Sequence, residues 1–392
     1  GTLSVRGGDG CVGQGGGNGG GGAGGRLAVY AQNASGWSGE FTADAGSQES
    51  ASANGIENRL QPASGTIFLS FDNGSDYLRV DCRSSDASSD VDATAATHVL
   101  DSWSGEVSSA QAMHAVEVFG ACTLAVSNGA HVPTRTVRGD GEGTVEVRDA
   151  AVLELTMGPP TALVLGALST NIQRLTVSSD ATAALHGRNL TVADGGEVRV
   201  RSGGRLKDVG PVAVESGGVL RLRNDGRAQC ANATGSGGAG SNPCPPIDKV
   251  AEGTYMFSSW TLARGSLVAM GHQGADASIS TACSMGTSFT STCKTTHQQT
   301  SAGTNRIIVH VLGGGLTLPE GAKLTLSGAG PSGGQEWNGL VGGLEGSGGA
   351  SSDGRNGGAG GGHSGAGGRG SRNRFVGNAH GSTIRPVLGG GG

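Results

Sequence analysis

An eleven-residue pattern of apolar and polar positions recurs along the middle of the chain. In LTVADGGEVRV (190–200) and VAVESGGVLRL (212–222), apolar residues occupy the first, third, ninth and eleventh places, and two glycines occupy the sixth and seventh. Related copies, with a small pair at the two glycine places, occupy 124–134, 145–155 and 316–326. Alternation with a period of two is typical of strands with one buried side. Each copy therefore predicts two short strands joined by a turn, where glycine supplies a positive φ or permits close backbone packing.

The spacing of these copies favours stacking over hairpins. Neighbouring copies begin 21 or 22 residues apart, and the 45 residues between 145 and 190 are about two such periods. Isolated hairpins of three-residue strands are unstable, whereas a repeat of this length fits one coil of a solenoid. We therefore expect an all-β fold, a parallel β-helix or β-solenoid. An antiparallel sandwich or meander is the alternative. In the β-helix, Val192 would lie over Val214, Val198 over Leu220 and Val200 over Leu222.

The coil pattern resembles the passenger domains of bacterial autotransporter adhesins and other extracellular parallel β-helix proteins. The resemblance covers roughly residues 115–227. It implies a fold and not an activity, because such coils carry adhesins, enzymes and structural fibres alike. A glycine tract followed by GRLAVYA (25–31) and SGTIFL (64–69) is also similar to repeats in very large glycine-rich surface proteins of microbes and protists.

Composition changes along the chain and predicts four segments. Glycine supplies 77 of 392 residues, against a usual share of about 7%. Aromatic residues make up only 4%, so a narrow core of Val, Leu and Ala is expected. The glycine tracts at 7–25 and 341–370 are either linkers or ordered chain packed where only glycine fits. The expected segments are a glycine-rich β segment (1–114), solenoid coils (115–227), a disulfide-bearing insertion (228–305) and a β segment with a glycine-rich tail (306–392).

Cysteines and glycosylation sequons indicate a secreted or cell-surface protein. Seven cysteines favour an oxidising compartment, and no run of 18 apolar residues predicts a membrane span. Two local disulfides and one longer bridge are expected, with Cys11 unpaired or intermolecular; the pairs are Cys230–Cys244, Cys283–Cys293 and Cys82–Cys122. Sequons for N-glycosylation lie at Asn33, Asn73, Asn189 and Asn232.

Stacked coils would also bring outward arginines together. Strands in neighbouring coils lie about 4.8 Å apart, where like charges repel unless something neutralises them. The expected neighbours, which we call the arginine strip, are Arg199 with Arg221, Arg201 with Arg223 and Arg205 with Arg227. The strip predicts either a site for an acidic or sulfated polysaccharide or solvated arginines neutralised by Glu197, Glu215 and Asp225.

No motif predicts a catalytic, cofactor or metal site. A polysaccharide-degrading β-helix would need paired carboxylates. The densest acidic group is Asp140, Glu142, Asp149 and Glu154, at turns and outward positions where solubility alone would place acids. The net charge of −5 is too mild to predict a nucleic-acid partner.

The sequence therefore predicts a structural role outside the cell. We expect a repetitive subunit or segment of a self-assembling fibre, surface hair or matrix, whose partners are copies of itself. A carbohydrate-binding adhesin is the alternative, and a polysaccharide-degrading β-helix enzyme ranks third.

Overall fold

The described part of the chain is all-β. The structure is a computed structural model, and it describes residues 2–9, 22–32, 40–46, 63–71, 75–83, 97–99, 112–156, 161–167, 170–223, 225–231, 244–271, 281–285, 291–295, 308–311 and 316–325. Within these ranges the only helical segment is one turn of 3-10 helix, Ile247–Lys249. Among the same residues we find no helix with the length and apolarity to cross a membrane. The chain divides into two compact units; the first holds Gly1–Arg221, Gly226–Val268 and Val309–Leu324, and the second holds the rest.

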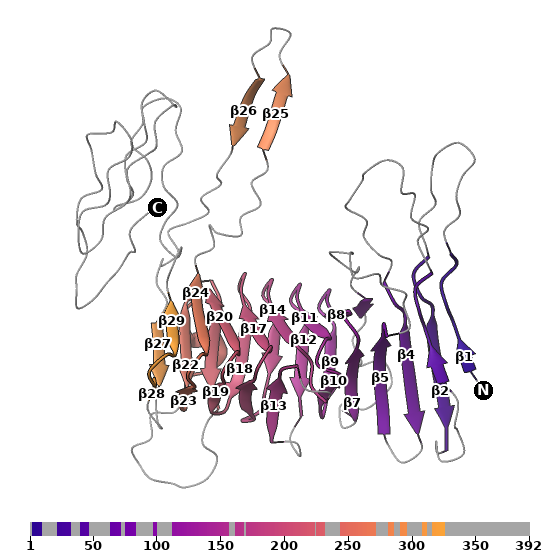
Figure 1. The fold of residues 1–392 in the computed structure, drawn as a ribbon, viewed down its shortest axis with the longest axis horizontal. Coiled ribbons are helices and arrows are strands. Elements are labelled where there is room, and N and C mark those ends of the chain that lie inside the picture. The colour runs from indigo at the N-terminus through magenta and orange to yellow at the C-terminus, as the bar shows by residue number, and fades with distance from the viewer. Residues whose placement is uncertain are drawn as a thin grey trace. The chain divides into compact units, whose positions relative to one another are not determined.

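Three sheets contain most of the strands (Figure 1). Sheet I has the order β29 (Lys323–Thr325), β24 (Leu267–Gly271), β20 (Val219–Arg223), β17 (Glu197–Val200), β14 (Arg174–Val177), β11 (Thr144–Val147), β8 (Thr123–Val126), β6 (Thr97–Val99). Sheet II has the order β27 (Ile308–Val311), β22 (Thr254–Phe257), β21 (Arg227–Cys230), β18 (Arg205–Val209), β15 (Thr182–Ala184), β12 (Val152–Leu155), β9 (His131–Thr134). Sheet III has the order β13 (Ala162–Leu165), β16 (Asn189–Val192), β19 (Val212–Val214), β23 (Trp260–Leu262), β28 (Leu316–Thr317).

From β11 to β21 the chain visits sheets I, II and III in turn, and neighbouring strands run parallel. β14, β15 and β16 make one such passage, and β17, β18 and β19 make the next. Leu175 pairs with Val198 in sheet I, and Val192 pairs with Val214 in sheet III, so each residue meets a partner from the following passage. The expected stacking of Val192 on Val214 is confirmed. Parallel pairing between successive passages is compatible with a β-helix and differs from an antiparallel sandwich.

The repeated sequence pattern occurs at two different turns of the chain, which the spacing alone did not reveal. The copies at 124–134 and 145–155 connect sheet I to sheet II, whereas those at 190–200 and 212–222 connect sheet III to sheet I. The long interval from 145 to 190 therefore does not relate equivalent positions. Both turns carry the same pattern because both need short alternating strands around a left-handed residue, which is Ala150 (φ 59°) in one and Gly217 (φ 76°) in the other.

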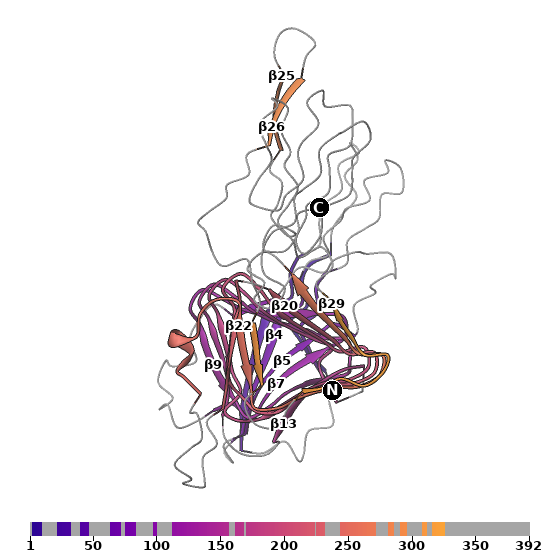
Figure 2. The same ribbon diagram turned by 90° about the vertical axis from the view of Figure 1, so that its left-hand side faces the viewer.

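The core is a narrow column of aliphatic side chains. In sheet I the column runs through successive strands in register, and each member is at most 1% exposed: Leu124, Val145, Leu175 and Val198. Figure 2 views the row of strands from its end, where the sheets lie around this interior. Among the described residues, the fully buried large rings come late in the chain, where Tyr255, Phe257 and Trp260 are at most 1% exposed. The indole Nε1 of Trp260 is buried and has no hydrogen-bond partner among the residues that the structure describes.

A fourth sheet contains the N-terminal strands and one antiparallel step. Its order is β10 (Val137–Gly139), β7 (Ala115–Phe119), β5 (Ser75–Asp81), β4 (Thr66–Phe71), β2 (Arg26–Ala31), and only β4 and β5 pair antiparallel. The register there places Ile67 opposite Arg79, so the apolar face of β4 continues as the charged face of β5. Ala43, Ile67 and Leu69 form a small second core on that face. Beside it lies a two-stranded parallel sheet, β1 (Thr2–Ser4) with β3 (Glu40–Thr42).

The predicted insertion at 228–305 is itself interrupted by strands of the three sheets, because β22, β23 and β24 lie within it. It also contains an antiparallel pair, β25 (Thr281–Met285) with β26 (Ser291–Thr295), in which Cys283 lies opposite Cys293. The four-segment division as a whole stays a prediction.

At Gly7 and Gly24, in the described ends of the first glycine tract, a side chain would not fit. The Gly22 N–H donates to the Gly8 carbonyl at 2.7 Å, and a Cβ on Gly7 would lie 2.2 Å from the Gly22 oxygen. These residues match the ordered-chain interpretation of the tract. The middle of this tract and the whole of 341–370 lie outside the described residues.

Candidate functional site

Three arginines surround one carboxylate on the outer face of sheet I. Val198 and Val200 point into the core, so the alternation of β17 places Glu197 and Arg199 on the outer face. Arg174 lies in register beside Glu197 on β14, and Arg221 comes from β20. The Nε atoms of Arg174 and Arg199 lie 2.7 and 2.8 Å from the carboxylate of Glu197, and that of Arg221 lies 2.5 Å away. We call these four residues the Glu197 cluster.

The Glu197 cluster carries more positive than negative charge. Burial alone would raise the pKa of Glu197, but contacts from Arg199, Arg221 and Arg174 lower it to about 2. The carboxylate is therefore ionised at any ordinary pH, and it neutralises only one of the three guanidinium charges. The side chains of Arg174, Arg199 and Arg221 are 35, 33 and 48% exposed, so the excess charge faces solvent.

The structure separates the predicted arginine strip into different environments. Arg205 and Arg227 do lie in register, but Arg205 pairs with Asp180 at 3.3 Å and Arg227 donates to a backbone carbonyl. Arg223 is only 8% exposed and lies 3.5 Å from Asp225. Arg199 and Arg221 of the strip belong to the Glu197 cluster, and Arg201 is half-buried in the turn after β17. Glu215, one of the acids expected to neutralise the strip, is exposed in the turn after β19.

Arg174 is the member that sequence reasoning missed. It begins the segment RLTVSSDATAAL (174–185), whose second half departs from the repeated pattern. The alternation of Leu175 and Val177 was the signal that could have placed Arg174 on the outer face beside β17.

A second carboxylate, Glu117 on β7, lies between two arginines on the fourth sheet. Glu117 is 1% exposed, and Arg79 and Arg138 pair with it from the strands on either side. The Arg79 guanidinium also lies 5.3 Å from the ring centroid of Phe119, and that of Arg138 lies 5.9 Å from the ring of Tyr77. Aromatic faces and the carboxylate thus hold both cations in place.

A third carboxylate lies between two histidines. Glu154 on β12 contacts His131 Nε2 at 2.6 Å through one oxygen and His186 Nε2 at 2.8 Å through the other. Burial would raise the pKa of Glu154, but the hydrogen bonds from His131 and His186 lower it. Within the described ranges, no group of His, Cys, Asp and Glu side chains is placed to hold a metal ion.

The acidic residues considered for catalysis lie in separate local interactions. Asp140 accepts the Gly120 N–H at 2.7 Å, which fixes a turn. Asp149 sits in a turn with φ 55° near Arg148. Glu142 is exposed, and Glu154 lies between the two histidines.

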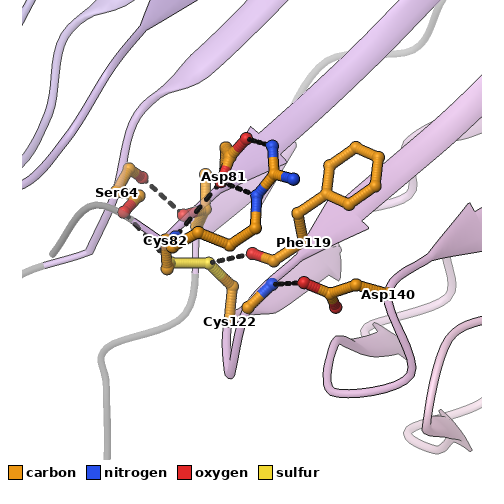
Figure 3. Close-up of a disulfide and its surroundings, with 9 residues drawn as sticks. Ser64, Asp81, Cys82, Phe119, Cys122 and Asp140 are labelled. Atoms are coloured by element: carbon orange, nitrogen blue, oxygen red, sulfur yellow. Dashed lines mark hydrogen bonds and ion pairs between the residues drawn. A yellow bond between two sulfur atoms is a disulfide. The ribbon is translucent and has the colours of Figure 1, made fainter. Parts of the chain in front are cut away.

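Two of the expected disulfides are bonded in the structure. Cys82 follows β5 and Cys122 precedes β8, with their Cα atoms 5.9 Å apart. In Figure 3 the Ser64 hydroxyl lies beside this bond, and it donates to Cys82 Sγ at 3.1 Å. The second bond, Cys230–Cys244, has a Cα separation of 5.8 Å. For Cys283 and Cys293 the opposite register is what a cross-strand bond requires, and their bond stays a prediction.

Of the four sequons, the described residues include only Asn189, which is exposed at the start of β16. Exposure is the condition that glycan attachment requires. Asn33, Asn73 and Asn232 lie outside the described residues, as does Cys11.

An open depression lies next to the Cys230–Cys244 bond. It measures about 610 Å³ and is lined by Lys207, Gln229, Cys244, Pro245, Pro246, Ile247 and Asp248. Among the described residues that line it, Lys207 and Asp248 are the only charged groups.

Comparisons with known proteins add no relative. No family model, no curated protein and no solved structure matches the chain. What can be inferred about function therefore depends on the chain's own geometry.

Proposed function

We propose that this chain is a segment of an extracellular structural protein, a β-solenoid that joins copies of itself end to end. The order of strands supports the solenoid, since from β11 to β21 the chain passes through three parallel sheets in turn and each passage pairs with the next. The glycine-rich fibre and surface proteins that the sequence resembles are consistent with this role.

The location of the exposed large apolar side chains is the main support for end-to-end assembly. Five are exposed among the described residues, and all belong to the first two or last two strands, or lie next to them. At the N-terminal side these are Leu3 on β1 (42%) and Tyr30 on β2 (75%). At the C-terminal side they are Leu316 (48%), Leu318 (50%) and Leu324 (45%), on or beside β28 and β29. Among the residues between them whose exposure the structure describes, no large apolar side chain is exposed.

Sheet edges explain why these positions would bind another copy. β27, β28 and β29 are each the last strand of their sheet, and β2 is the last strand of the fourth sheet. An edge strand presents unpaired backbone donors and acceptors that can pair with another strand. The two ends differ in sequence, so the contact between copies is heterologous, and heterologous contacts that do not close produce filaments.

The disulfides support a location outside the cell. The bonds Cys82–Cys122 and Cys230–Cys244 are of a kind that is stable in oxidising compartments and rare in the cytosol. The exposed sequon at Asn189 is consistent with the same location.

The proposal is tested by following the size of the purified chain as its concentration rises. Sedimentation velocity and negative-stain microscopy should show growing rods for the wild type. The variant carrying both Leu316→Arg and Leu324→Arg should remain monomeric, because charge at the C-terminal edge prevents docking. Ser216→Arg, which adds one arginine at an exposed turn between β19 and β20, should assemble normally.

A mixing experiment tests the heterologous geometry. The double variant keeps the N-terminal edge, so a small amount added to wild type should shorten the rods by capping one end. A wild type that stays monomeric at every concentration, or a double variant that assembles like wild type, would refute end-to-end assembly.

A carbohydrate-binding adhesin is the second candidate, and the Glu197 cluster is the observation that favours it. Its excess positive charge faces solvent on three neighbouring strands of sheet I, β14, β17 and β20.

A further inference from the structure

We infer that the Glu197 cluster binds an acidic polysaccharide, with Arg174, Arg199 and Arg221 contacting its sulfate or carboxylate groups. This inference does not require that the chain assemble with itself. Of the six arginines in the predicted strip, the inferred site keeps Arg199 and Arg221, and it adds Arg174.

The geometry presents three cations on three neighbouring strands. β14, β17 and β20 are consecutive in sheet I, and neighbouring strands lie about 4.8 Å apart. The three guanidiniums therefore reach one carboxylate from three neighbouring strands and form one compact group of cations. Acidic sugars repeat their charged groups along a chain, so one such group can approach this cluster at many positions of the polymer.

Glu197 holds the three guanidiniums in position. Oε2 of Glu197 receives Arg174, and Oε1 receives both Arg199 and Arg221. Nε–H of Arg174 and of Arg221 donates to the carboxylate, whereas Nε of Arg199 lies 2.8 Å from Oε1 without the alignment of a hydrogen bond. These contacts use Nε and not the terminal guanidinium nitrogens. Terminal guanidinium nitrogens match the two oxygens of a sulfate or carboxylate. Arginines already fixed by Glu197 lose less side-chain entropy when they bind.

The charge of the cluster is that of an anion site. Three arginines face one carboxylate whose pKa is about 2, so the cluster keeps an excess of two positive charges at any pH above that value. The Glu117 pair carries two arginines on one carboxylate, and aromatic rings contact both. The excess is therefore larger at Glu197 and lacks competing ring contacts.

A polysaccharide fits better than a nucleic acid. Proteins that bind nucleic acid through the phosphate backbone spread positive charge over a wide surface, whereas this chain carries a net charge of −5 and a local cluster. The disulfides also favour a compartment in which polysaccharides are the common polyanions.

The test is binding to dextran sulfate and to polygalacturonate, measured by calorimetry at low salt, with uncharged dextran as the reference. Arg174→Gln and Arg221→Gln should each weaken binding about fivefold, the effect of about 1 kcal/mol for one charged contact. Arg138→Gln is the matched control, because Arg138 pairs with a buried glutamate and is 46% exposed, against 48% for Arg221. Its affinity should stay close to that of the wild type.

Glu197→Gln gives a result that a merely structural role would not produce. The amide oxygen of glutamine still accepts hydrogen bonds that position the arginines, but the negative charge that competes with the ligand is gone, so affinity should rise while the folded spectrum by circular dichroism is kept. The inference is overturned by equal weakening in Arg138→Gln, by binding to uncharged dextran, by tighter binding to a DNA oligonucleotide, or by no binding at low salt. Rod growth is measured in separate samples, so failure of this site would leave end-to-end assembly standing.

Discussion

Glycine can be required because the backbone has a positive φ or because a Cβ would not fit, and three glycines of this chain separate these two reasons. Gly8 has no neighbour within 4 Å of an added Cβ and no positive φ. Gly129 has the same open space but a φ of +72°. Gly218 has no positive φ, but its Cβ would lie 2.2 Å from the Val192 carbonyl oxygen, on the neighbouring passage of the chain. Alanine should therefore meet no obstacle at Gly8, force an unfavourable backbone conformation at Gly129, and cause a steric clash at Gly218.

The expected changes in the free energy of unfolding follow from these differences. Gly8→Ala should stabilise the chain by about 0.5 kcal/mol, because alanine restricts the unfolded state. Gly129→Ala should cost about 1 kcal/mol for the left-handed conformation; Ala150 already adopts φ 59° at the corresponding turn of the next copy, so the cost is bearable. Gly218→Ala should cost about 3 kcal/mol or more, because a backbone oxygen held in a parallel ladder cannot move aside.

Urea unfolding followed by circular dichroism measures all three variants on the same scale. The midpoints should fall in the order Gly8→Ala, Gly129→Ala, Gly218→Ala, with unchanged slopes. The reasoning fails if Gly218→Ala loses less than about 1 kcal/mol, or if Gly129→Ala is the more damaging of the two.

Two further predictions concern acid stability and covalent cross-links. The pKa of Glu197 is about 2 in the folded chain, against a reference value of 4.5. The stabilisation that ionised Glu197 gives the folded chain is therefore complete above pH 4.5 and is lost as the pH falls towards 2. Free energies of unfolding measured from neutral pH down to about pH 2 should fall less steeply in Glu197→Gln than in the wild type, and equal slopes would contradict the shift. Replacing Cys82 and Cys122 by serine should cost about 4 kcal/mol and replacing Cys230 and Cys244 about 3 kcal/mol, because the sequence separations are 40 and 14; urea midpoints check this order, and the reverse order would contradict it.

The sequence predicted most of the repeating part of the fold and less of its ends. Alternating valines and leucines carry the strand signal, so the pairing of Val192 with Val214 followed from the pattern alone. The same pattern serves two different turns, however, and local alternation does not say which sheet a strand joins. The antiparallel step at β4 and β5 was also beyond the sequence, because Ile67 opposite Arg79 depends on how two separate strands pair.

The charged clusters show the same limit. The register of Arg205 with Arg227 followed from the spacing of the repeat. Arg174 lies in a less regular passage of the chain, and the residue that pairs with it is Glu197, so no repeated arginine drew attention to it. A carboxylate surrounded by three cations depends on side chains from three strands, so only the assembled sheet brings it together.

The Cys82–Cys122 bond has a mechanical consequence for a protein that is pulled from its two ends. Tension arriving along β5 would otherwise pass to β7 through backbone hydrogen bonds between the two strands. The sulfur bridge instead transmits it directly from the end of β5 to the start of β8. The chain between the two cysteines bears no load and adds no length under strain, so this part of the molecule would behave as an inextensible joint while the bond is intact.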